Sequence, residues 1–150
     1  MEVRRIPSDS PDALALVAAM FAEIATLYPQ LADDPGPSAT PQDLAPPGGV
    51  YMALYEGDRA VAGGGVKRLE DGAGEIKRMY VVPDRRGAGL SRALLVALED
   101  AARDLGYARV RLDTGVHQQA ALHLYRSAGY SDVDDYNDNP YASYWGEKRL

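Results

Sequence analysis

The chain has 150 residues, no cysteine, and 22 acidic against 16 basic side chains, giving a formal net charge of −6 at pH 7. This composition excludes disulfides, thiolate metal sites and a cysteine nucleophile, and it argues against nucleic-acid binding through clustered Lys and Arg. No segment reaches the roughly 20 apolar residues of a membrane span, and the opening residues lack the apolar core of a signal peptide. We therefore expect a single cytoplasmic domain over residues 1–150, a monomer or homodimer that binds no nucleic acid and no membrane.

The first third of the chain predicts a strand, a helix and a loop. Residues 3–6 suit a short strand. Ser10 and Pro11 suit the N-cap and first position of a helix. Apolar residues recur in this helix at helical spacing: Leu14, Val17, Phe21, Ile24 and Leu27. Residues 32–49 are rich in Pro and Gly, and we interpret them as a loop or lid over a site.

From Val50 the pattern changes to strands. Residues 50–69 suit two strands joined by a tight turn at 56–59, and residues 74–82 suit a third. The glycines at 63–65 indicate a bulge or a close backbone approach rather than a second phosphate site. A helix, a strand, another helix and two closing strands follow. This order predicts one mixed α/β domain.

The stretch VVPDRRGAGLSRALL, residues 81–95, passes from a strand through a glycine turn into a helix. The unpaired amides and the dipole at a helix start favour an anion, to which Arg86 would add charge and Ser91 a hydroxyl. The dinucleotide G-x-G-x-x-G pattern is absent, because Arg92 stands in place of its third glycine. The turn therefore predicts a phosphorylated ligand, the alternative being an ordinary turn with solvated arginines.

Two stretches resemble motifs of the GNAT superfamily of N-acetyltransferases. RGAGLS at 86–91 is similar to the acetyl-CoA motif [Q/R]-x-x-G-x-[G/A], with Ser91 in place of the final Gly or Ala. QQAALHLYRSAGY at 118–130 resembles the N-x-x-A-x-x-[L/F]-Y-x-x-x-G-[F/Y] block, with Gln118 in place of Asn. The resemblance covers roughly residues 50–150. It implies a GNAT-like α/β fold whose central, mostly antiparallel sheet is splayed around a CoA site and flanked by about four helices.

The resemblance also implies roles for individual residues. The main chain of Met79 and Val81 would hold the thioester and pantetheine, and Gln118 would contact the pantetheine arm. Tyr125 matches the family's tyrosine near the sulfur, a general acid for the departing thiolate, although a core aromatic is the alternative. The amides of the turn would hold the pyrophosphate: Arg86, Gly87, Ala88, Gly89, Leu90 and Ser91.

Glu75 is the candidate general base. It opens the third strand, where the family often has a glutamate, and its spacing from Met79 is even, so we expect both side chains on one face. The alternatives are a solvated carboxylate at a strand end and a chain of waters in place of one base.

Four basic residues lie on adjoining predicted strands: Lys67, Arg68, Lys77 and Arg78. Like charges repel across a sheet, so an anion bound between these side chains would reduce their repulsion. We expect Arg68 and Arg78 to bind a substrate carboxylate, as in an amino acid or a similar compound. The alternative is a solvated sheet edge.

These expectations give an acyltransferase that moves the acetyl group of acetyl-CoA directly to a primary amine of a small molecule. Two alternatives stay open: a protein or peptide N-acetyltransferase with an open groove, and a non-catalytic acyl-CoA-binding module. The two histidines are isolated and the carboxylates scattered, so the sequence predicts no metal site. We interpret the acidic stretch SDVDDYNDN at 131–139 as a solvated loop.

Overall fold

The structure is a computed structural model that describes residues 1–31 and 39–150. In this part of the chain seven strands form one sheet in the order β1-β2-β3-β4-β5-β7-β6. The strands are β1 (Glu2–Arg5), β2 (Val50–Glu56), β3 (Arg59–Arg68), β4 (Gly74–Val81), β5 (Arg109–Thr114), β6 (Ser131–Asp132) and β7 (Tyr144–Arg149). The helices are α1 (Pro11–Leu27), α2 (Leu90–Asp104) and α3 (Gln119–Ser127), with short 3-10 turns η1 (Pro29–Leu31) and η2 (Pro83–Arg85).

The order of helices and strands is the predicted one, and the mixed α/β class is confirmed. The described part of the chain holds three α-helices, where the resemblance implied about four. Of the expected lid at 32–49, residues 32–38 lie outside the described residues. The remainder packs on the sheet through Leu44, which is buried beside Tyr51 and Gly65. No helix in the described residues is long and apolar enough to cross a membrane.

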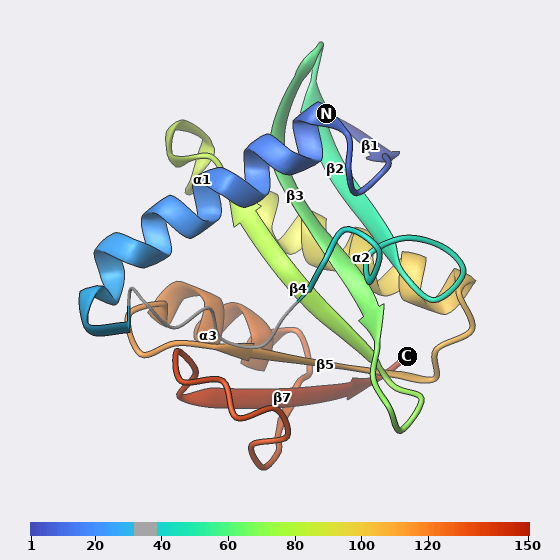
Figure 1. Ribbon diagram of the computed structural model, residues 1–150, viewed down its shortest axis with the longest axis vertical. Coiled ribbons are helices and arrows are strands. Elements are labelled where there is room, and N and C mark those ends of the chain that lie inside the picture. Colours follow the sequence, from blue (N-terminus) through green and yellow to red (C-terminus); the bar gives the residue numbers. More distant parts are fainter. Residues whose placement is uncertain (32–38) are drawn as a thin grey trace.

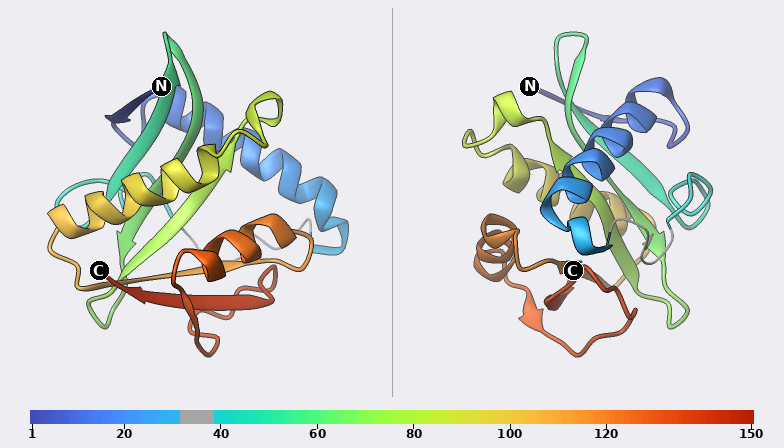
Figure 2. Two further views of the ribbon diagram at one scale, coloured as in Figure 1. Left: turned by 180° about the vertical axis from the view of Figure 1, so that it is seen from behind. Right: turned by 60° about the vertical axis from the view of Figure 1, so that its left-hand side comes forward.

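Helices cover both faces of the sheet. Helix α1 lies on one face, and α2 and α3 lie on the other (Figures 1 and 2). The larger core is on the α2 face, where Leu94, Leu95 and Leu98 are buried against β2, β3 and β4. Most of the hydrophobic stabilisation therefore comes from this side of the sheet.

Helix α1 begins as predicted, with Ser10 accepting a hydrogen bond from the Ala13 amide at 3.4 Å. The residues that it buries are not the ones whose spacing indicates the helix. The buried residues are Ala13, Leu16 and Met20, whereas Leu14 and Phe21 are 47% and 41% exposed. An apolar stripe wider than the buried face does not indicate which of its residues reach the sheet.

The sheet is antiparallel except between β4 and β5, which run parallel. These two strands pair only at Gly74 with Val110 and at Glu75 with Arg111. Beyond this point they separate, as Figure 1 shows. The mostly antiparallel, splayed sheet is therefore confirmed.

A β-bulge interrupts β4 opposite the predicted glycine bulge. Gly65 pairs with Lys77 and Gly63 with Tyr80, so β4 has one more residue than β3 over this stretch. Arg78 has a φ of +63°, which is uncommon for a residue other than glycine. The bulge predicted at 63–65 is confirmed, with the extra residue on the partner strand.

The bulge changes which side chains share a face. Lys77 lies opposite Gly65 on the α1 face, and Glu75, two residues earlier, shares that face. After the extra residue, Met79 instead lies on the α2 face, where a side chain at Gly64 would meet both Met79 and Leu98. The prediction that Glu75 and Met79 share one face is therefore wrong, because the bulge breaks the alternation between them.

Candidate active site

The separation of β4 and β5 leaves part of β4 without a strand partner on one side. Strand β4 continues to Val81 and β5 to Thr114, yet their pairing ends at Glu75 and Arg111. Met79 and Val81 lie on this open stretch. An extended ligand arm therefore has a backbone against which to bind in the middle of the sheet.

The open stretch of β4 leads into the glycine turn before α2. Gly87 and Gly89 have φ values of +82° and +79°, which favour glycine, and nothing lies within 4 Å of the place where a side chain would begin. Ala93 donates to the carbonyl of Gly89, so the amides of Leu90 and Ser91 precede the first helical bond. An accessible backbone with free amides fits a pyrophosphate.

Arg86 is positioned differently from its expected role. Its Nε donates to the Val81 carbonyl at 3.0 Å, and its guanidinium pairs with Glu23 of α1 at 2.9 Å. The guanidinium thus fixes the turn to β4 and α1, and its charge is neutralised by Glu23. An anion at this turn therefore depends mainly on backbone amides.

Tyr125 lies on α3 with its hydroxyl 3.7 Å from the Met79 sulfur. The tyrosine is 6% exposed. Burial, and to a lesser degree the charge of Asp113, raises the pKa of Tyr125 well above its usual range. The hydroxyl is therefore a proton donor at neutral pH, located beside the open stretch of β4.

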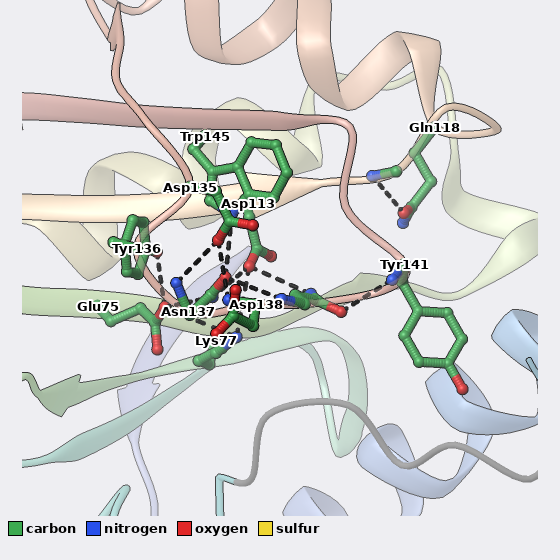
Figure 3. Close-up of polar contacts among 12 residues, drawn as sticks. Glu75, Lys77, Asp113, Gln118, Asp135, Tyr136, Asn137, Asp138, Tyr141 and Trp145 are labelled. Carbon is green, nitrogen blue, oxygen red and sulfur yellow. Dashed lines mark hydrogen bonds and ion pairs between the residues drawn. The ribbon is translucent and has the colours of Figure 1, made fainter.

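Glu75 is 2% exposed, so it is not a solvated strand-end carboxylate. Its Oε2 accepts hydrogen bonds from the Tyr136 hydroxyl at 2.6 Å and from Nδ2 of Asn137 at 3.2 Å. The ammonium of Lys77 lies 3.7 Å from Glu75 and 3.7 Å from Asp113 of β5. The cluster links β4 to β5 where the two strands separate (Figure 3).

The loop between β6 and β7 supplies the rest of this cluster. Nδ2 of Asn137 also donates to Asp113 at 2.6 Å, and Nδ2 of Asn139 donates to the same oxygen at 3.1 Å. The Trp145 indole donates to Oδ1 of Asn137 at 2.9 Å. We expect a solvated loop here, but its Tyr136 and Asn137 point toward Glu75 and Asp113 (Figure 3). That interpretation holds only for its exposed residues, such as Asp134 and Asp135.

Gln118 directly precedes α3, and its side-chain oxygen accepts hydrogen bonds from other residues of the protein. It accepts from the Gly115 amide at 3.1 Å and from the Tyr28 hydroxyl at 3.3 Å. Tyr28 also contacts the rings of His117 and Tyr141. Gln118 therefore orders the loop after β5 at the far end of the open stretch, and its contact with pantetheine stays a prediction.

The two arginines expected to bind a carboxylate do not lie together. Arg68 is exposed at the end of β3 and stacks over Tyr107 at 5.5 Å. Arg78 lies at the bulge and stacks over Phe21 of α1 at 4.6 Å. We therefore keep only Arg78 as a candidate ligand for a substrate carboxylate.

Comparison with known proteins agrees with this geometry. The sequence pattern of the Acetyltransferase (GNAT) family matches residues 17–130. The chain belongs to this family. It is 30% identical over 128 residues to the N-acetyltransferase YjgM of Escherichia coli, itself named as uncharacterized, covering 79% of this chain and 76% of that protein. It is also 38% identical over 92 residues to an IAA acetyltransferase of Azospirillum brasilense, covering 61% of this chain and 60% of that protein.

Solved structures extend the likeness over the whole chain. A Klebsiella pneumoniae protein named as an acyl-CoA N-acyltransferase is 33% identical, with a TM-score of 0.79 over 99% of this chain and 97% of its own. The PaiA N-acetyltransferase of Thermoplasma acidophilum, solved in complex with coenzyme A, has the same fold at 12% identity and a TM-score of 0.72. The GNAT fold is therefore shown for the entire domain.

Sequence reasoning missed most of the cluster around Glu75. Asp113, Tyr136 and Asn137 carry no motif, and they join Glu75 only because β5 and the β6–β7 loop pack beside β4. One signal was present in β5. Its polar residues alternate with the buried Val110 and Leu112, which assigns Asp113 to the face opposite the larger core.

Proposed function

We propose that this GNAT chain transfers the acetyl group of acetyl-CoA to a primary amine of a small molecule. The observation that carries the proposal is the open stretch of β4. It runs from the Glu75 cluster past Tyr125 to the amide-rich turn at 86–91. Acetyl-CoA has a pyrophosphate, an extended arm and a thioester, and this stretch offers a binding surface for each in the same order.

Acetyl-CoA would be held mainly by backbone. In this proposal the amides of Gly87 to Ser91 bind the pyrophosphate, and the main chain of Met79 and Val81 aligns the pantetheine arm. Holding the thioester and the amine together contributes much of the rate, because it replaces a bimolecular encounter by an intramolecular one. The accessible glycine backbone and the unpaired helical amides support this assignment.

Glu75 and Tyr125 would act on the two protons of the reaction. Glu75 accepts a proton from the acceptor ammonium, through a water because the carboxylate is 2% exposed. The neutral nitrogen then attacks the thioester carbon, a C–N bond forms, the C–S bond breaks, and the nitrogen releases its second proton to solvent to become the amide. Tyr125 gives its proton to the departing thiolate and regains one from solvent. The two side chains face opposite sides of the sheet, which separates the incoming amine from the leaving sulfur.

Thiol release from acetyl-CoA tests the proposal. The chain is incubated with a panel of amino acids, polyamines and aminoglycosides, and mass spectrometry identifies any acetylated product. We expect thiol release that depends on the amine. Binding of CoA with no turnover on any amine would instead support a non-catalytic acyl-CoA-binding module.

A further inference from the structure

Arg78 is a partly buried cation without a carboxylate partner. Among residues 1–31 and 39–150 no hydrogen bond or ion pair involves its guanidinium, and its Nε is buried with no acceptor. Its one close contact is the ring of Phe21, 4.6 Å away. Burial lowers the pKa of Arg78, and the charges of Glu75 and Asp113 offset this only in part. A desolvated cation of this kind is costly unless an anion joins it.

The other arginines show that this situation is unusual for the chain. Most of them pair with a carboxylate, for example Arg59 with Asp84 at 2.9 Å. In the described part of the chain, the other arginines without a carboxylate partner are all exposed to water: Arg5, Arg68, Arg92 and Arg149. Arg78 therefore differs from them in being both shielded and unpaired.

The bulge places this cation beside the proposed reaction centre. Arg78 lies on the α1 face of β4, as Glu75 and Lys77 do. The bulge adds one residue to β4, so the adjacent residues Lys77 and Arg78 both face α1. Three residues along a strand separate Arg78 from Glu75 by roughly 10 Å between backbones. An acceptor that reaches this face of β4 therefore meets a cation at one end. At the other end it meets two carboxylates that share one ammonium.

We propose that Arg78 binds the carboxylate of the acceptor, so that the acceptors are amines that carry a carboxylate, such as amino acids. This inference rests on the proposed function and adds the class of acceptor. A guanidinium pairs with a carboxylate through two parallel hydrogen bonds. The ammonium of the same molecule is attracted to the Glu75 and Asp113 end. A phosphate dianion fits less well, because these two carboxylates would repel its second charge.

Matched acceptor pairs test the inference. The substrates are an amino acid, its primary amide and its aminophosphonate analogue. The enzymes are the wild type, Arg78→Met, Arg78→Lys and the control Arg149→Met, which removes the same charge from an exposed site. We expect the wild type and the control to favour the amino acid over its amide by about 100-fold in kcat/KM. Arg78→Met should lose this preference, because its rate on the amino acid should fall about 100-fold more than its rate on the amide, and Arg78→Lys should retain part of the preference.

Several results would overturn the inference. Equal wild-type rates on acid and amide, or a preference for the phosphonate, would show that Arg78 does not select a carboxylate. An equal loss on both acceptors in Arg78→Met and Arg78→Lys, with a lower melting temperature, would show a structural role. The inference expects an unchanged or higher melting temperature in Arg78→Met, because an unpaired cation is removed.

A binding measurement separates this inference from the proposed function. If the wild type acetylates no amine, the proposed function fails, and calorimetry with N-acetylglycine still tests Arg78. We expect Arg78→Met to weaken this binding at least tenfold relative to Arg149→Met. Equal binding by the two variants would overturn the carboxylate site.

Discussion

The hydroxyl of Tyr136 donates a hydrogen bond of 2.6 Å to Oε2 of Glu75 and so connects the β6–β7 loop to β4. Burial first, and then the charge of Glu75, raises the pKa of Tyr136, so its oxygen keeps the proton at neutral pH. The tyrosine is therefore a permanent hydrogen-bond donor to the carboxylate. The loop thereby orients the proposed base.

Replacing Tyr136 by Phe tests this relationship. Loss of this donor leaves the proposed base without the hydrogen bond that orients it, so we expect kcat/KM to fall about tenfold at neutral pH while CoA affinity is unchanged. Tyr55→Phe is a matched control, because its hydroxyl also donates to a carboxylate at 2.6 Å, that of Asp12 in the first turn of α1. An identical loss of activity in both variants, or in neither, would contradict the positioning role of Tyr136.

Replacing Glu75 by Gln tests the base itself. The amide keeps the shape of the side chain but cannot accept a proton, so we expect kcat/KM to fall about 100-fold at neutral pH. The deficit should shrink as the pH approaches the amine's own pKa, near 10.4 for a lysine-like amine, where free amine becomes abundant. The measurement is a pH profile of both proteins with CoA affinity as a control. Superimposable profiles would leave Glu75 only a structural role.

Tyr125→Phe tests the proposed acid. We expect kcat to fall at least tenfold with unchanged CoA affinity, since the lost hydroxyl acts only on the departing thiolate. Because the pKa of Tyr125 is raised, its proton is retained, and the wild type should show no loss of activity from this group below about pH 10. Tyr130→Phe, a buried neighbour with ring centroids 5.9 Å apart, is the control. Equal rates for wild type and Tyr125→Phe would make Tyr125 a core aromatic.

Local patterns were sufficient to predict most of the fold. Ser10 and Pro11 indicate a helix start, and the glycines at 63–65 indicate a bulge, because caps and bulges depend on a few adjacent residues. The direction of the Met79 side chain could not be predicted. It depends on which strand carries the extra residue, and that is decided by pairing between β3 and β4.

The residues that surround Glu75 could be predicted from the sequence even less well. Its hydrogen-bond partner Tyr136 lies 61 residues away in the chain, within a stretch whose composition indicates a loop. Packing alone brings the two together. The separation of Arg68 from Arg78 has the same origin, since charge repulsion between strands depends on a register that composition does not contain.

Ser91→Glu tests the turn at the start of α2. A carboxylate among the helical amides would compete with and repel a pyrophosphate, so we expect CoA affinity to fall at least tenfold. The control is Ser131→Glu, which adds the same charge at another exposed serine, on β6. This design avoids substituting Gly89, whose φ of +79° would strain any larger residue. Unchanged CoA affinity in calorimetry would show that the pyrophosphate does not bind at this turn.

Asp71 lies in the turn between β3 and β4 and binds β5 at the end of the sheet where β4 and β5 are still paired. It accepts hydrogen bonds from Arg111 at 2.6 Å, from Arg109 at 3.1 Å and from the Ala73 amide at 3.2 Å. The bond from Arg111 is the main cause that lowers the pKa of Asp71. A folded-state pKa below the unfolded value gives stability that is complete above the unfolded pKa, near 3.9, and is lost as the pH falls below it.

Asp71→Asn should therefore destabilise the fold at pH 7 and not at low pH. The side chain is 44% exposed, so solvent screening limits the expected loss in free energy of unfolding to about 1 kcal/mol or less. Urea unfolding at pH 7 and near pH 3 measures the difference, with Asp134→Asn at an exposed loop position as the control. The difference between wild type and Asp71→Asn should shrink at the lower pH, because the stabilising effect of the charge is lost as the pH falls below the unfolded pKa toward the lowered folded-state pKa. A difference that is as large near pH 3 as at pH 7 would show that the charge of Asp71 does not hold β5 to the β3–β4 turn.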